Sequence, residues 1–88
     1  MARTFRATLT MSLQGKTTQG RVPIAEEVVE EMGLKPGETV RASMRGTDFT
    51  AKVFGSLKSL GLLVPMDIIS SLGLRDGQGV RVTVHGRA

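Results

Sequence analysis

The chain has 88 residues, a formal net charge of +4 and no cysteine. Its length allows one hydrophobic core, and the lack of cysteine excludes a disulfide framework, a thiolate nucleophile and a cysteine-ligated zinc site. No apolar run approaches the roughly 20 residues that span a bilayer, and the first residues lack the apolar segment of a signal peptide, so we predict one cytoplasmic domain.

The first predicted element is a strand from Phe5 to Met11, where apolar residues alternate strictly with polar ones. This period of two is typical of a strand with one buried face. A polar loop bounded by glycine is expected next, from Gln14 to Gly20, followed by a short strand from Arg21 to Ile24. Pro23 cannot donate a hydrogen bond to a ladder, so it is expected to mark the end of that strand.

An amphipathic helix of two to three turns is predicted after Pro23. Its inward face holds Ile24, Ala25, Val28, Val29 and Met32, and its outward face holds Glu26, Glu27, Glu30 and Glu31. Gly33 is expected to end the helix in the left-handed conformation, and Lys35 to Glu38 fits a type II turn. A closing strand follows, with Val40, Ala42 and Met44 inward.

The same elements then occur a second time. Residues 33–46 align without gaps on residues 73–86, with six of 14 positions identical, and Val22-Pro23-Ile24 matches Val64-Pro65-Met66. The second copy is predicted to contain a strand from Phe49 to Val53, with Phe49, Ala51 and Val53 at the alternating apolar positions, then a loop from Gly55 to Gly61 and a short strand from Leu62 to Met66. A shorter helix should then place Ile68, Ile69 and Leu72 inward, and a last strand should do the same for Val80, Val82 and Val84.

Two copies of one β-β-α-β unit, residues 5–46 and 49–86, therefore make up the chain. One unit buries only half a core, whereas two units related by a pseudo-twofold axis complete each other's interior. We predict a mainly β fold with two short helices, in which the strands close into one barrel and leave no exposed sheet edge.

Parts of this sequence resemble those of known protein families. Gly20-Arg21-Val22-Pro23-Ile24, the helix after it and Gly33-Leu34-Lys35-Pro36-Gly37-Glu38-Thr39-Val40 resemble the repeat unit of AbrB/MazE-type swapped-hairpin proteins and, more distantly, of double-psi barrels. The whole chain is more similar to an uncharacterised domain family found beside YdeI/OmpD-associated proteins, in which Phe-x-Ala-x-Leu, Gly-x-x-Phe and Gly-Leu-x-x-Gly-x-x-Val strands recur. The resemblance implies a double-split, AbrB-like (cradle-loop) β-barrel, with both halves on one chain. AbrB-like proteins bind DNA or act as antitoxins.

Few residues offer catalytic or metal-binding chemistry. The chain has one histidine, and no pair of titratable groups converges in the pattern that general acid and base catalysis needs. Gly15-Lys16-Thr17 resembles the end of a phosphate-binding loop, but Thr10 stands where that loop needs glycine and a strand follows instead of a helix. We therefore expect no enzymatic activity, no metal centre and no cofactor.

The candidate functional residues are basic and lie on the outward faces of strands. Half of the eight acids lie in the first helix, so the rest of the chain, with 12 Lys and Arg and four acids, carries a formal charge of +8. Arginine and hydroxyl side chains are typical phosphate contacts, which favours duplex nucleic acid or another polyanion as partner. The candidate contacts are Arg41, Arg45, Arg81 and His85 on the closing strands, with Lys16, Arg21, Lys52 and Lys58 around them, extended by Ser43, Thr83, Arg6 and Thr8.

Two other interpretations stay open at this point. The same basic residues can simply keep a barrel surface solvated, and the Gln14 to Gly20 and Gly55 to Gly61 loops can form the site of an accessory protein-interaction or small-ligand domain. The glutamate face of the first helix can likewise be solvated or meet a basic partner. Only Phe54 is free of the predicted core and able to stack a base, which disfavours recognition of single strands. A monomer suffices for the barrel, and a dimer is also allowed.

Overall fold

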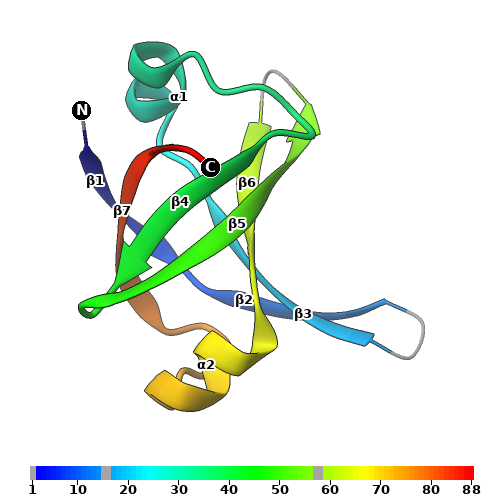
Figure 1. Ribbon diagram of the computed structural model, residues 1–88. Coiled ribbons are helices and arrows are strands. Elements are labelled where there is room, and N and C mark those ends of the chain that lie inside the picture. The colour runs from blue at the N-terminus through cyan, green and yellow to red at the C-terminus, as the bar shows by residue number, and fades with distance from the viewer. Residues whose placement is uncertain (1, 15–16, 57–58) are drawn as a thin grey trace.

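The computed structural model describes residues 2–14, 17–56 and 59–88, without the side chains of residues 12–19. These residues form seven strands and two helices (Figure 1). In chain order the elements are β1 (Arg3–Thr8), β2 (Thr10–Gln14), β3 (Thr17–Pro23), α1 (Glu26–Met32), β4 (Thr39–Met44), β5 (Thr47–Ser56), β6 (Ser59–Val64), α2 (Met66–Leu72) and β7 (Gly79–Arg87). Within the described part of the chain, neither helix is long and apolar enough to cross a membrane.

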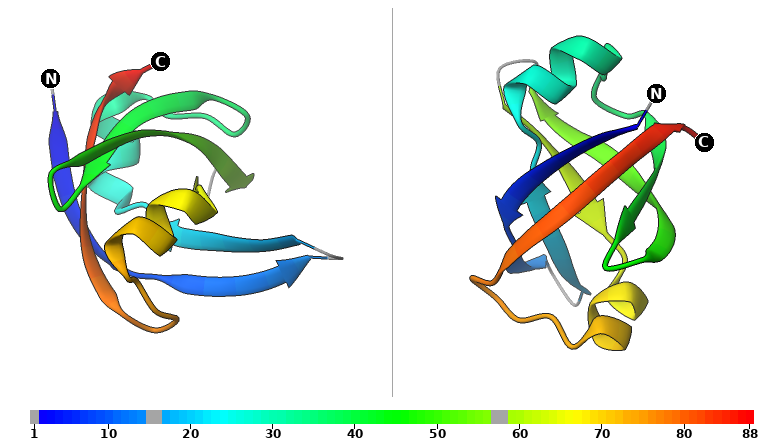
Figure 2. Two further views of the ribbon diagram at one scale, coloured as in Figure 1. Left: turned by 60° about the horizontal axis from the view of Figure 1, so that its bottom comes forward. Right: turned by 90° about the vertical axis from the view of Figure 1, so that its left-hand side faces the viewer.

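The strands form one antiparallel sheet in the order β1-β7-β4-β5-β6-β3-β2, which curls into a half-barrel (Figure 2). The strands at the two ends of this order, β1 and β2, are consecutive in the chain and are separated only by Leu9. Because β1 also contacts β3, the two ends of the curled sheet lie near each other. The helices lie at opposite ends of the half-barrel, α1 beside β1 and α2 beside β3 (Figure 1).

The inside of the half-barrel is apolar. All six residues predicted to point inward from the two closing strands are buried, and among the described residues no polar or charged residue is buried. The largest fully buried side chains are Leu9, Met44, Leu62, Val22, Val40, Val53, Val82 and Val84. The period of two in β4 and β7 therefore predicted correctly which residues form the core and which face outward.

Both helices end as the sequence predicts. Gly33 and Gly73 have φ angles of 61° and 64°, in the left-handed region that glycine adopts at little cost. The next residue in each copy closes the cap: Leu34 N donates to Val29 O at 3.1 Å, and Leu74 N donates to Ile69 O at 3.0 Å. Leu34 and Leu74 are both buried, which supplies the hydrophobic contact of such caps.

The turn after each helix is hydrogen-bonded to the other repeat. Gly37 N donates to Val53 O and Val53 N donates to Glu38 O, both at 2.8 Å. The second copy repeats the pattern, since Gly77 N donates to Leu9 O at 2.7 Å and Leu9 N donates to Gln78 O at 2.8 Å. These reciprocal bonds join the turn of each copy to a buried strand residue or linker residue of the other copy, Val53 or Leu9.

The two predicted loops are wrong. β2 and β3 pair as far as Gln14↔Thr17, and β5 and β6 pair as far as Ser56↔Ser59, so the strands of these hairpins continue through most of both segments. The sequence predicts loops in these two segments because they are rich in polar residues and glycine. Apolar and polar residues alternate little there, so the period of a strand is not visible. The opening strand also differs from expectation, because it is interrupted at Leu9.

The predicted match of Pro23 with Pro65 is also wrong. Pro65 is the N-cap of α2, and Ala25 is the N-cap of α1 with nearly the same backbone angles. Val28 N and Val29 N both donate to Ala25 O, just as Ile68 N and Ile69 N donate to Pro65 O. Pro23 instead ends β3, so Pro23 and Pro65 do not occupy equivalent positions in the two repeats. With this correction α1 and α2 are both seven residues long, and the second helix is not shorter.

Candidate anion-binding site

The outer face of β1, β7, β4 and β5 carries most of the predicted contacts. Because Val80, Val82 and Val84 point inward, the residues between them on β7 point outward. Across these strands Thr4 lies opposite Thr83, Thr83 opposite Ser43, and Ser43 opposite Asp48. The hydroxyls of Thr4 and Thr83 share a hydrogen bond of 2.8 Å, so hydroxyl groups form a row across the middle of this face.

Three arginines gather on one side of the hydroxyl row. Arg6 on β1 lies directly opposite Arg81 on β7, and Arg45 follows the end of β4 (Figure 2, right, where β1 and β7 face the viewer). They border a shallow groove of about 840 Å³, which we call the arginine groove. Its lining residues are Arg6, Ala7, Thr8, Ser43, Arg45, Gly46, Gly79, Val80, Arg81 and Thr83.

The arginine groove contains no carboxylate among its lining residues. Among the described side chains, the ion pairs are Arg3 with Glu31 and Arg87 with Glu38, and neither involves an arginine of the groove. Like charges on opposed strands repel, so the Arg6 and Arg81 pair destabilises the sheet unless an anion neutralises it. The groove therefore concentrates positive charge beside hydroxyl donors, as phosphate binding requires.

A second hollow lies on the other side of the hydroxyl row. It has a volume of about 360 Å³ and is lined by Arg41, Ala42, Asp48, Phe49, Thr50 and His85. We call it the mixed hollow, because the Asp48 carboxylate offsets the charge of Arg41. His85 Nε2 and Ser43 Oγ are hydrogen-bonded at 2.9 Å, and a register shift in the β4–β7 pairing lies beside them. Arg41 and His85 are thus separated from Arg45 and Arg81, and the structure does not bring the four into one site.

The structure modifies the position predicted for Arg45. The sequence pattern predicts Arg45 on the outward face of the closing strand, but β4 ends at Met44 and Arg45 is the first residue of the turn to β5. Its φ of 51° lies in the left-handed region. The period of two continued to Arg45 in sequence, and the turn was missed because arginine is not a residue that tight hairpin turns favour.

The other predicted contacts lie apart from the groove. Lys52 is exposed on β5 opposite Thr39 and Leu63. Arg21 is half-buried with its guanidinium 4.7 Å from the centre of the Phe54 ring, a cation–π contact that occupies the one aromatic ring considered for base stacking. Phe54 also packs on Gly61, where an added Cβ would approach the ring to 2.8 Å. Lys16 and Lys58 lie outside the described residues.

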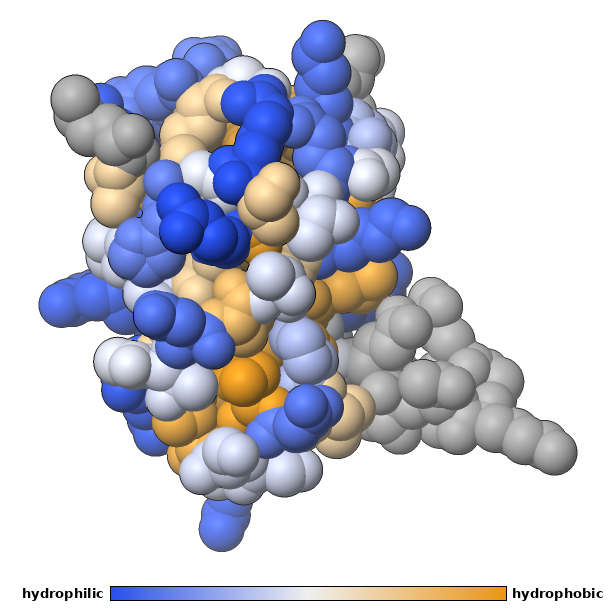
Figure 3. All heavy atoms as spheres, viewed as in Figure 1, coloured by the Kyte–Doolittle hydropathy of each residue, from blue (hydrophilic) through white to orange (hydrophobic). Residues whose placement is uncertain are grey.

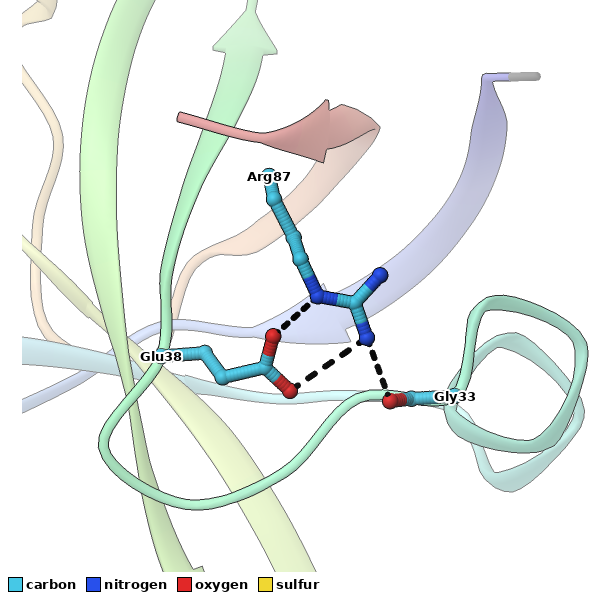
Figure 4. A network of polar contacts seen from close by, with 3 residues as sticks. All are labelled: Gly33, Glu38 and Arg87. Carbon is cyan, nitrogen blue, oxygen red and sulfur yellow. Dashed lines mark hydrogen bonds and ion pairs between the residues drawn. The ribbon is translucent and has the colours of Figure 1, made fainter.

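Sequence reasoning missed the role of Arg87. Its guanidinium binds the Glu38 carboxylate, and its Nη2 donates to Gly33 O at 2.8 Å (Figure 4). The hydrogen bond from Arg87 lowers the pKa of Glu38, and partial burial opposes that shift. Arg87 lies beyond the aligned part of the repeats, so no internal match pointed to this contact. It ties the end of β7 to the C-terminus of α1, where a cation is favoured.

The face seen in Figure 3 differs from the arginine side. Hydrophobic residues gather in its lower half, over and beside α2, while the upper half is more hydrophilic. Met66 at the start of α2 is the exposed large hydrophobic residue of the described chain, at 36 %.

Among the described residues, no three histidine or acidic side chains gather as a metal site would require.

Comparison of the chain with protein-family models, with curated proteins and with solved structures gave no match. The resemblance to AbrB-like proteins and to the family found beside YdeI/OmpD-associated proteins therefore stays a prediction.

Proposed function

We propose that this protein is a non-enzymatic domain that binds duplex nucleic acid by its phosphate backbone, with the arginine groove as the main contact. The observation that carries the proposal is the convergence of Arg6, Arg45 and Arg81 on one groove without a carboxylate in its lining. Guanidinium groups bind phosphate oxygens with paired hydrogen bonds, and the hydroxyl of Thr8, which also lines the groove, adds a further donor.

We assign the half-barrel to the double-split, AbrB-like type, on the support of the reciprocal hydrogen bonds that join Leu9 and Val53 to the turns of the opposite repeat. The resemblance to DNA-binding AbrB-like proteins agrees with the basic groove. The cytoplasm is the proposed compartment, on the basis of a sequence without cysteine.

Sequence-independent binding is the form of recognition that this groove favours. Contacts to phosphate position a protein on nucleic acid, whereas sequence is read by side chains that reach base edges. The three arginines sit on the face of a sheet and in a tight turn, not on a helix that could enter a major groove. Affinity is therefore expected to come mainly from released counterions.

The test is a salt titration of binding to short DNA duplexes of unrelated sequence, followed by fluorescence anisotropy. Three phosphate contacts predict that log K falls with log salt concentration at a slope of about −2.7. The Arg6→Ala/Arg81→Ala double variant should flatten the slope by about 2. Arg75→Ala is the control and is compared per charge removed, because Arg75 is exposed, lies outside the groove and uses its backbone N–H, not its side chain, to bind Gln78.

Two results would contradict the proposal. If the wild-type protein does not bind duplexes even at low salt, the arginines of the groove serve only to keep the surface of the sheet solvated. If Arg75→Ala flattens the slope by about 1, as much per charge removed as the double variant, binding follows net charge and has no site. In the first case the alternative, an accessory protein-interaction or small-ligand domain, becomes the better account.

A further inference from the structure

The turn between β4 and β5 has an unusual residue in its first position. Met44 and Thr47 form the last strand pair, so Arg45 and Gly46 alone make the connection. Their φ angles of 51° and 80° are both positive, as in a type I′ turn. Such turns favour asparagine, aspartate or glycine first, because a larger side chain in the left-handed region strains the backbone. Within the described residues, Arg45 is the one non-glycine residue with positive φ.

The contacts of Arg45 inside the fold do not explain its presence. Its Nη1 donates to Leu72 O at the end of α2, but the distance of 3.4 Å exceeds the usual 2.7–3.2 Å. The side chain is exposed. A weak exposed hydrogen bond contributes little to stability, and asparagine would form the turn with less strain.

The position of Arg45 offers a different reason. The β4–β7 pairing ends at Met44↔Val82, so the next residue on each side is Arg45 and Arg81, and both line the arginine groove with Arg6. Left-handed residues that the fold tolerates at a cost tend to lie at binding sites. The strands provide two guanidinium groups to the groove, those of Arg6 and Arg81. The turn adds a third at the end of the groove, that of Arg45.

We infer that Arg45 is a phosphate-contacting residue whose strained backbone is kept for ligand binding and not for folding. The inference rests on the proposed function and deepens it, since it explains why the turn carries an arginine where asparagine would be less strained, and it assigns the phosphodiester backbone as the ligand that this arginine serves. In the bound state the guanidinium leaves Leu72 O for a phosphate oxygen. The exchange is favourable because a charge-assisted bond replaces a long bond to a neutral carbonyl.

The experiment compares wild-type protein with Arg45→Asn and Arg45→Lys. Asparagine removes the charge and relieves the turn, so the melting temperature without DNA should rise by about 4 °C. The same variant should flatten the salt slope of duplex binding by about 1. Lysine keeps the charge and the strain, so Arg45→Lys should retain both the wild-type slope and the wild-type melting temperature.

The outcomes separate this inference from the proposed function. If wild-type protein binds duplexes and Arg45→Asn binds with an unchanged slope, Arg45 does not contact phosphate while the proposed function stands. If Arg45→Asn melts no higher than wild-type protein, the arginine is not strained and the argument from the turn is wrong. If wild-type protein does not bind, the proposed function fails, and the inference fails with it whatever the melting temperatures are.

Discussion

The turns that follow α1 and α2 make the same pair of hydrogen bonds to the opposite repeat, yet the outer faces beside them differ in charge. Arg81 lies opposite Arg6, whereas its counterpart Arg41 lies opposite Thr50. The counterpart of Arg45 is His85, which continues along β7 in place of making a turn. Internal symmetry thus restricts the backbone and the buried residues, while exposed side chains differ between the copies. A contact seen in one repeat cannot be assumed in the other.

The largest expected effect concerns the buried residues that the two repeats share. Leu9 and Val53 are 0 % and 1 % exposed and make equivalent backbone bonds to the opposite repeat. Leu9→Ala is expected to lower the free energy of unfolding by about 2–5 kcal/mol, and Val53→Ala by about 2 kcal/mol because it removes fewer buried carbons. Urea unfolding followed by circular dichroism measures both values.

Leu63→Ala is the control for this pair, since Leu63 lies on the outward side of β6 and is only half-buried. It should cost less than either core variant. If Leu63→Ala proves as destabilising as Leu9→Ala, the assignment of the two faces of the sheet is wrong.

The next effect distinguishes the arginine groove from the mixed hollow. Arg81→Glu places a negative charge between Arg6 and Arg45 and should weaken duplex binding about 30-fold at moderate salt. Arg41→Glu makes the same change of charge in a hollow that already contains Asp48, and should weaken binding about 3-fold through net charge alone. Equal losses measured by anisotropy would show that the two hollows contribute alike.

The mainly β fold with two helices could be predicted because its signals are local and occur twice. The predicted closure into a barrel without sheet edges is not seen in the described residues, since β1 and β2 at the ends of the sheet do not pair with each other. Alternation placed Val40 and Val80 in the core, and glycine after an apolar periodic segment placed the helix ends at Gly33 and Gly73. The hairpins of β2–β3 and β5–β6 were not predicted, since their strands are held by backbone pairing and their composition resembles that of loops.

The candidate site could be predicted only in part. Strand alternation identified which arginines face outward, but it could not show that Arg81 has Arg6 beside it while Arg41 has Thr50. That difference depends on register between strands far apart in sequence. The contact of Arg87 with Glu38 depends in the same way on where β7 ends relative to the turn before β4.

A smaller effect tests whether the two helix caps are equivalent. Gly33→Ala and Gly73→Ala should each lower the free energy of unfolding by about 1 kcal/mol, because alanine is strained at positive φ. Added Cβ atoms would meet only Arg87 Nη2 at 3.8 Å in the first cap and nothing within 4 Å in the second, so the costs should be equal. Gly79→Ala is the control, because Gly79 is exposed, has ordinary backbone angles and has open space around it. A cost for Gly79→Ala equal to that of the caps would show that loss of glycine, and not positive φ, is what matters.

The smallest expected effect is on the pH dependence of stability. It concerns Glu38, whose counterpart in the second repeat is the neutral residue Gln78. The hydrogen bond from Arg87 lowers the pKa of Glu38 in the folded protein relative to the unfolded chain. The contact therefore stabilises the fold above the ordinary carboxyl pKa of about 4.5, and this contribution is lost as the pH falls through the lowered value. Glu38→Gln should melt below wild-type protein at neutral pH, and the difference should shrink below about pH 4.5. Melting curves across that range measure this difference.

Gln78→Ala is the control. It removes the acceptor of the Arg75 N–H at 3.0 Å and involves no titrating group, so its difference in melting temperature from wild-type protein should not change with pH. A difference for Glu38→Gln that stays constant into strong acid would mean that the ion pair with Arg87 does not contribute to the stability of the folded protein.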